Sequence, residues 1–235
     1  MNSRPTFESN SIRDTQRGFS LVEMAIVLAI VALLLAGLLP TLSAQVEQQR
    51  RTETRKLMDE IQQALFGYAI INGHLPCPSS ASNPNFGEAD ASCVSPSSEG
   101  FLPWKSLGVS ETDAWGIKGS TQRIGYWRYR VEPAFASSVA FTLSTTSSST
   151  LDLQVRDSMN NRLTSSSERP LAIIFSTGPD LTPNGENANY EQSSNATYQS
   201  DTPGKNPDGT NFDDLTVWIS RPLLFSRMVT AGKLP

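Results

Sequence analysis

An apolar stretch near the start of the chain limits what this sequence can fold into. Residues 19–39 read FSLVEMAIVLAIVALLLAGLL, and Glu23 is the only charged side chain among them. At about 1.5 Å per residue, a helix of this length extends about 31 Å, close to the roughly 30 Å of hydrocarbon in a bilayer. We therefore predict one membrane-spanning helix over residues 19–40.

The position of Glu23 needs an explanation, because an ionised carboxylate at bilayer depth costs on the order of 2.5–3.5 kcal/mol on insertion scales. A cut between Gly18 and Phe19 would create an α-ammonium group four residues before Glu23, about one helical turn away. The carboxylate would then have a partner of opposite charge, in the same chain or in a neighbouring copy. The cost of the buried charge thus favours proteolytic processing.

A conventional secretory signal is the alternative. Leu42, Ser43 and Ala44 could form a small-residue cleavage site before Gln45. However, the apolar core of such a signal spans only about 7–15 residues, and its usual pattern contains no acidic residue. The apolar stretch found here is longer and carries Glu23, which argues against a conventional signal.

The segment RGFSLVEM and the apolar run behind it resemble the N-terminus of type IV prepilins and of the pseudopilins of type II secretion systems. Gly18 corresponds to the residue before the cleavage site, Phe19 to the first mature residue and Glu23 to the glutamate at the fifth position. The resemblance implies that residues 1–18 are a leader peptide, removed by a prepilin peptidase that also methylates the amino group of Phe19. It also implies that Glu23 aligns a subunit with the N-terminus of its neighbour as a filament grows.

Pro40 lies where many members of this family have a helix-perturbing proline. Its ring removes the hydrogen bond to the carbonyl group of Ala36, which predicts a bend in the helix. A helix end at the membrane surface is the alternative. The helical pattern resumes after Pro40, so we expect the bend.

Residues 41–72 continue as an amphipathic helix. Leu57, Ile61, Leu65 and Tyr68 recur at helical spacing, and Asn72 with Gly73 predicts the helix end. The resemblance implies an α+β, pilin-like fold, in which this half of the helix packs on an antiparallel sheet within a periplasmic head of residues 73–235. The sequence predicts its strands, and Ser220 is predicted to cap a short terminal helix; the predicted strands cover residues 123–132, 138–143, 151–156, 171–175 and 215–219.

Cys77 and Cys93 are the only cysteines, and they lie in a region predicted to be loop. In an oxidising compartment this spacing predicts a disulfide, worth about 3 kcal/mol in the chain-entropy model. Two free thiols are the alternative. His74 and Cys77 could also be considered as a nucleophile and base, but no third group nearby would orient them.

Residues 176–214 form a long polar connection, and connections of this length are usually functional or disordered. They resemble the calcium-binding loop of major pseudopilins in a turn that contains Asp180 and in the acidic pair Asp213–Asp214 ahead of Trp218. The resemblance implies a calcium site at these three carboxylates, whereas the composition of the segment equally fits a solvated surface loop, and both interpretations stay open. Further oxygen ligands in the segment are Asn184, Glu186, Asp201 and Asp208.

These features predict a pseudopilin or minor pilin rather than an enzyme. Its expected partners are other pilin subunits, the prepilin peptidase, the inner-membrane assembly platform and the membrane, with the N-terminus cytoplasmic. The alternative is a pilus-borne adhesin or DNA-uptake module, with the long loop of residues 176–214 as its binding surface. The only basic and aromatic cluster in the sequence is residues 126–130, and its alternation more simply predicts a strand with one buried face. The net charge of −4 indicates no nucleic-acid binding by bulk charge. A nucleophile–base–acid set and a G-x-S-x-G elbow are both missing from the sequence.

Overall fold

The computed structural model describes residues 18–93, 99–136, 153–165, 168–189 and 196–234, and of residues 36–42 it describes the backbone alone. The chain divides into two compact units, residues 1–47 and residues 48–235. Most of the predicted leader and the predicted strand over residues 138–143 lie outside the described residues.

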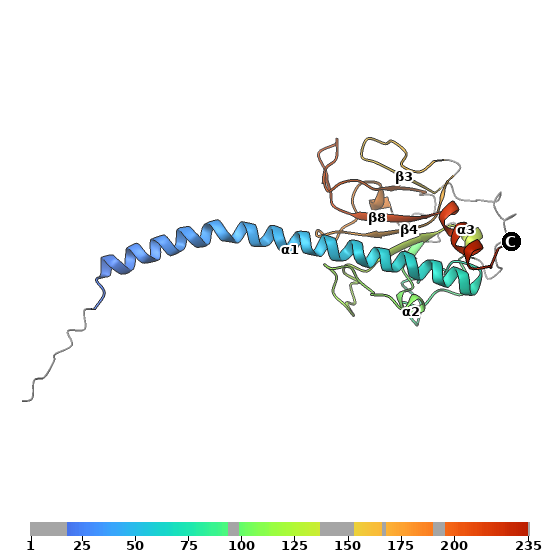
Figure 1. Ribbon diagram of the computed structural model, residues 1–235, viewed down its shortest axis with the longest axis horizontal. Coiled ribbons are helices and arrows are strands. Elements are labelled where there is room, and N and C mark those ends of the chain that lie inside the picture. The colour runs from blue at the N-terminus through green and yellow to red at the C-terminus, as the bar shows by residue number, and fades with distance from the viewer. Residues whose placement is uncertain (1–17, 94–98, 137–152, 166–167, 190–195, 235) are drawn as a thin grey trace, which may run out of the picture. The chain divides into compact units, whose positions relative to one another are not determined.

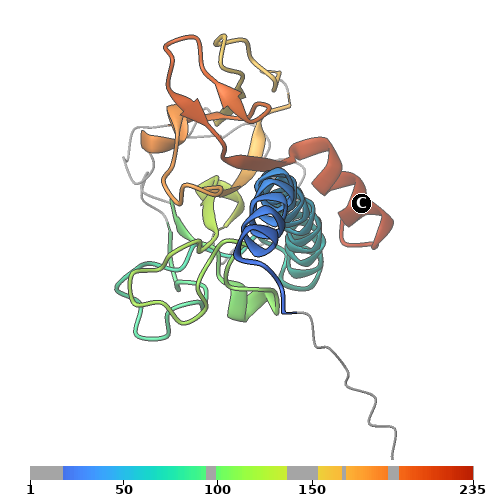
Figure 2. The same cartoon turned by 90° about the vertical axis from the view of Figure 1, so that its left-hand side faces the viewer.

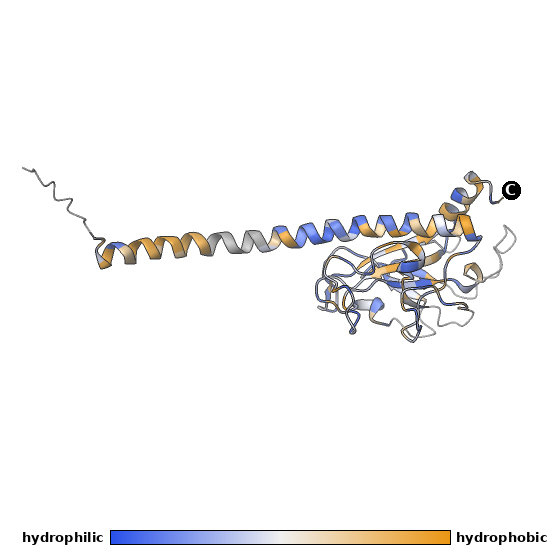
Figure 3. Ribbon diagram, turned by 90° about the horizontal axis from the view of Figure 1, so that it is seen from below, coloured by the Kyte–Doolittle hydropathy of each residue, from blue (hydrophilic) through white to orange (hydrophobic). Residues whose placement is uncertain are grey.

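One helix, α1 (Leu21–Asn72), runs from the first unit into the second. Its described first part is mostly hydrophobic, apart from a hydrophilic stretch near its start, and its second part is mixed (Figure 3). Within the described part of the chain, no helix has a long enough apolar stretch to cross a membrane. The helical backbone continues through Pro40, whose side chain is not among those described, so the predicted bend there stays a prediction.

The second unit is built on a four-stranded antiparallel sheet with the order β1-β2-β4-β8. This confirms the predicted α+β arrangement of a helix with an antiparallel sheet. The strands β2, β4 and β8 fall inside predicted strands or within a residue of them, whereas β1 lies in a region predicted to be loop. The strands are β1 (Glu99–Phe101), β2 (Arg128–Val131), β4 (Pro170–Ser176) and β8 (Leu215–Ser220).

The second part of α1 packs on one face of this sheet. Ile61 and Leu65 of the predicted helical stripe are buried there, together with Met58, whereas Leu57 and Tyr68 are half-buried. The sheet contributes alternate residues to the same core, among them Tyr129, Val131, Ala172, Ile174 and Ile219. The terminal helix α3 (Arg221–Thr230) adds Leu224 and Met228. Ser220 is at its N-cap position as predicted, but the Ser220 side chain makes no capping hydrogen bond.

The opposite face of the sheet is covered by a second, smaller sheet. Its strands β3 (Gln154–Arg156) and β5 (Thr197–Gln199) are parallel, and Val155 and Tyr198 pack on Ile173 and Phe175. The central strand β4 is therefore buried on both faces. The expectation of one buried face for residues 126–130 was wrong, because Arg130 points into this second layer and is fully buried.

Short elements complete the head. In Figures 1 and 2 the segments of residues 77–93 and 102–125 lie on one side of the head, and the segments around β3 and β6 lie on the other. These elements are α2 (Trp104–Leu107), β6 (Gly204–Lys205), β7 (Asn211–Phe212) and two 3-10 turns, η1 (Pro133–Phe135) and η3 (Gly185–Asn189).

Cys77 and Cys93 form a disulfide, with their Cα atoms 5.6 Å apart. Cys77 is buried at the edge of the main core, and Cys93 packs against the same core. The bridge therefore fastens a loop-rich segment to the sheet and helix. It also removes the alternative of a Cys77 thiol paired with His74, because the sulfur is already bonded.

Replacing both cysteines by alanine is expected to lower the free energy of unfolding by about 3 kcal/mol, since the open loop gains conformational freedom in the unfolded chain. Urea denaturation of the detergent-solubilised chain measures this change. Ser82→Ala, in the same loop and exposed, is a matched control. Equal stability of the double variant and the parent chain would contradict the expectation.

Candidate functional site

The peptide bond between Gly18 and Phe19 lies just outside the start of α1. The amide of Glu23 donates a hydrogen bond of 3.1 Å to the Ser20 hydroxyl oxygen, and the amide of Met24 donates one of 3.1 Å to the Ser20 carbonyl. Ser20 is therefore the N-cap, and a cut before Phe19 leaves the cap in place. The pattern Ser20-x-x-Glu23 is a capping-box sequence, a signal that the sequence analysis missed.

The backbone around Gly18 does not need a glycine. A Cβ atom at this position would meet no other atom within 4 Å, and the backbone is not left-handed. Phe19 beside it is exposed. A glycine without a structural reason in an exposed, non-helical segment is consistent with a requirement imposed by a processing enzyme.

The alternative cleavage site is placed differently. Ala44 and Gln45 lie inside α1, and both residues are exposed on a continuous helix. Proteolytic cleavage is concentrated at chain termini and exposed loops rather than within hydrogen-bonded helices. The bond Gly18–Phe19 thus lies outside a helix and Ala44–Gln45 inside one, and cleavage at Gly18 stays a prediction.

Glu23 is exposed on the surface of the apolar part of α1. In the sequence it is the only charged residue between Arg17 and Glu47. Cleavage at Gly18 removes Arg17, and the next basic residue along the helix is Arg50. A positive partner for Glu23 inside the first unit can then come only from the new amino terminus, in this copy or in another.

The three aspartates of the predicted calcium loop all hydrogen-bond to Asn184, Asp180 and Asp214 through their carboxylates and Asp213 through its backbone amide. The Asn184 side-chain amide donates to Asp180 Oδ2 over 3.1 Å, and its side-chain oxygen accepts from the amide of Asp213 over 3.0 Å. Its own backbone amide donates to Asp214 Oδ2 over 2.9 Å. Gly178 has φ +64°, and a Cβ atom there would lie 2.5 Å from the Asp213 carbonyl oxygen. The turn at Gly178 therefore brings the two ends of the long loop together.

Asp214 is the unusual member of this group. It is 1 % exposed, and its Oδ2 also accepts a 2.9 Å hydrogen bond from the Asn187 side chain. Its Oδ1 has no hydrogen-bond partner among the described residues. Burial is the main cause that raises the pKa of Asp214 to about 7, and the negative charges of Asp213 and Asp180 contribute to the same rise.

The described residues contain no group of three or more Asp, Glu, His or Cys side chains placed to hold a metal ion. Calcium at Asp180, Asp213 and Asp214 therefore stays a prediction. Two other predicted ligands bond elsewhere: Asp201 accepts from the Ser158 amide over 2.9 Å, and Asp208 accepts from Thr210 over 2.7 Å.

The described residues of the head line at least two pockets. One, of about 470 Å³, is lined by loop residues that include Asp157, Glu186 and Asp208 but no lysine or arginine. The other, of about 350 Å³, lies between α1 and β8 and has Asp214 in its wall. Neither lining is strongly basic, as a site for a phosphate backbone would be.

The basic and aromatic residues 126–130 are not a binding surface. Tyr126, Trp127, Tyr129 and Arg130 are buried. Arg128 is half-buried, with its guanidinium carbon 4.2 Å from the centre of the Phe101 ring.

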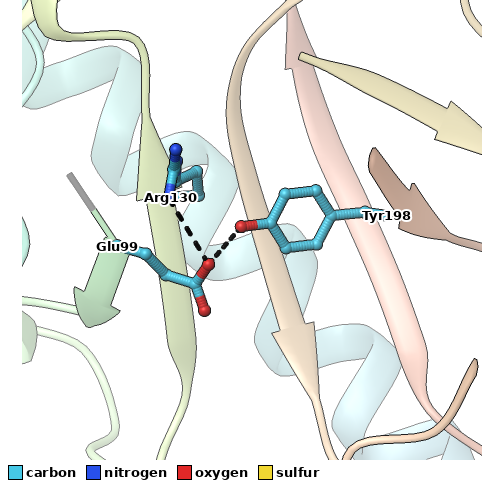
Figure 4. A network of polar contacts seen from close by, with 3 residues as sticks. All are labelled: Glu99, Arg130 and Tyr198. Carbon is cyan, nitrogen blue, oxygen red and sulfur yellow. Dashed lines mark hydrogen bonds and ion pairs between the residues drawn. The ribbon is translucent and has the colours of Figure 1, made fainter. Parts of the chain in front are cut away.

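Arg130 forms part of a buried polar network (Figure 4). Its Nη1 lies 3.7 Å from Glu99 Oε2, and the Tyr198 hydroxyl donates a hydrogen bond to the same oxygen. Glu99, Arg130 and Tyr198 belong to β1, β2 and β5, so this network ties the main sheet to the second layer. Its role is structural.

Comparison with known proteins identifies one match. Residues 13–39 match the family model described as the prokaryotic N-terminal methylation motif, the signature of type IV prepilin-like proteins. No curated protein and no solved structure matches the chain significantly.

Proposed function

Because this chain carries the N-terminal signature of type IV prepilin-like proteins, we propose that it is a pseudopilin or minor pilin of a type II secretion system or a type IV pilus. A prepilin peptidase removes residues 1–18 and methylates Phe19. Residues 19–40 hold the subunit in the bacterial inner membrane, with the N-terminus in the cytoplasm and the head in the periplasm. The assembly platform then transfers subunits into a filament, where the apolar helices form the core.

The observation that carries this proposal is the arrangement at the start of α1. An exposed glycine that the fold does not require precedes a capped helix, and a single carboxylate lies one turn inside its apolar part. Cleavage after Gly18, followed by pairing of the new amino group of Phe19 with Glu23, would explain all of these features. The disulfide supports a periplasmic head, because disulfides persist in oxidising compartments.

Processing can be tested by expressing the full chain with an active prepilin peptidase or with an inactive variant of it. We expect the membrane-bound protein to lose the leader only with the active enzyme. Loss of the same segment with the inactive enzyme would contradict the proposal.

Gly18→Ala is expected to leave the fold unchanged and to slow processing several-fold, so that precursor accumulates. The fold has room for the added methyl group, and only the peptidase would detect it. Immunoblotting of precursor and mature bands measures the ratio, and thermal unfolding of the purified precursor checks the fold. Gly204→Ala, at an exposed glycine of the head where the backbone is not left-handed and a Cβ atom meets no atom closer than 3.8 Å, provides a control for expression. A precursor fraction equal to that of the parent chain would count against recognition of Gly18.

A further inference from the structure

The pocket between α1 and β8 has the composition of a site for a basic side chain. Met58, Leu215 and Val217 provide apolar walls, and Asp59, Asp201 and Asp214 provide carboxylates. The long aliphatic part of an arginine or lysine packs on apolar walls while its charged end reaches carboxylates. We call this pocket the acidic socket.

The acidic socket contains a carboxylate oxygen, Oδ1 of Asp214, that receives no hydrogen bond from the described residues. Asp214 is 1 % exposed. A buried carboxylate oxygen without a donor is costly, so a donor from outside would be stabilising. Arg55 also lines the pocket, but among the described residues no ion pair joins Arg55 to Asp214.

Building on the proposed function, we propose that the acidic socket binds the Arg50 side chain of a neighbouring copy of this chain. Arg50 is exposed on α1 and has no ion pair among the described residues. It cannot enter the acidic socket of its own chain, because it precedes Met58 by eight residues, about 12 Å along the helix axis. Suppose that a neighbouring copy has its α1 parallel to this one and displaced along the helix axis by about this distance. The Arg50 side chain of that copy then lies beside the acidic socket of this chain. Arginine suits the site because its planar group can donate to two carboxylates at once.

The first test is cysteine cross-linking in the assembling system, with chelator present because calcium at Asp214 would compete. Two tagged versions of the full chain are co-expressed, one with Arg50→Cys and the other with Asp201→Cys. We expect a mixed dimer joined through these positions. Lys118→Cys, an exposed residue away from the acidic socket, replaces Arg50→Cys in the control and should give no dimer.

Ile26→Cys distinguishes failure of the acidic socket from failure of the proposed function. Ile26 lies in the apolar part of α1, which would form the filament core. Cross-linking between Ile26→Cys copies without the Arg50–Asp201 dimer would overturn the acidic socket and leave the proposed function standing. Absence of both cross-links would overturn both. Formation of both supports the socket.

The second test is charge reversal. Arg50→Glu is expected to lower the assembled fraction about fivefold, the size of effect that a partly exposed ion pair produces. Adding Asp59→Arg, at an exposed position in the pocket wall, should restore assembly in part. Lys118→Glu makes the same charge change elsewhere and should assemble normally. An unchanged assembled fraction for Arg50→Glu, or no rescue by Asp59→Arg, would overturn the proposal.

Discussion

Replacing Glu23 with alanine is expected to leave cleavage after Gly18 intact and to lower the assembled fraction at least tenfold. Under the proposed function the carboxylate pairs with the amino group of Phe19, and a loss of about 1.4 kcal/mol of pairing energy already changes an equilibrium tenfold. In hydrocarbon the pair is worth more than in water, because the surrounding dielectric constant is low. Separating processed subunits in the membrane from subunits in sheared filaments measures this fraction.

Two further variants make this test specific. Glu23→Gln removes the charge but keeps a residue that suits the third position of a capping box after Ser20. It should therefore assemble as poorly as Glu23→Ala, if charge rather than helix capping matters. Glu53→Ala, at an exposed glutamate on the same helix, should assemble normally. Normal filaments from Glu23→Gln would show that the carboxylate charge is not needed.

Asp214→Asn is expected to stabilise the head at pH 8 by up to about 4 kcal/mol, because the pKa of Asp214 is raised by burial from 3.8 to about 7. The folded state then binds more protons than the unfolded state between these pH values, so the stability of the parent chain falls as pH rises. Asparagine has no charge to lose, and its side-chain oxygen can still accept from Asn184 and Asn187. The difference between variant and parent should shrink as pH falls toward 4.

Urea denaturation of the full chain in detergent and chelator, at several pH values, measures this difference. Asp208→Asn is the matched control, because hydrogen bonds from Thr210 lower the pKa of that exposed carboxylate and no gain at pH 8 is expected. A difference that does not change with pH would contradict the assignment. Calcium added at pH 8 should stabilise the parent chain and not Asp214→Asn, if the predicted calcium site exists.

The sequence predicted the features that depend on local pattern. The apolar run and the spacing of Ile61 and Leu65 predicted α1, because a helix places every third or fourth residue on one face. The strongly apolar strand β4 and the cysteine pair were also recognisable.

Features that depend on distant contacts could not be predicted. The strand β1 has three residues and exists because it pairs with β2, and β5 pairs with β3 from a distant part of the chain. Arg130 looked like an exposed strand residue, because only the fold places Glu99 and Tyr198 beside it. The three loop aspartates were singled out by sequence, but the role of Asn184 between them follows only from the turn at Gly178.

The central claim is that cleavage creates an amino group that serves as the counter-ion of Glu23. A mass spectrum of the N-terminal peptide, from protein extracted from membranes, tests this claim most directly. The expected peptide begins at Phe19 and is heavier than the unmodified peptide by one methyl group. A peptide that begins at Met1 or at Gln45 would contradict the account.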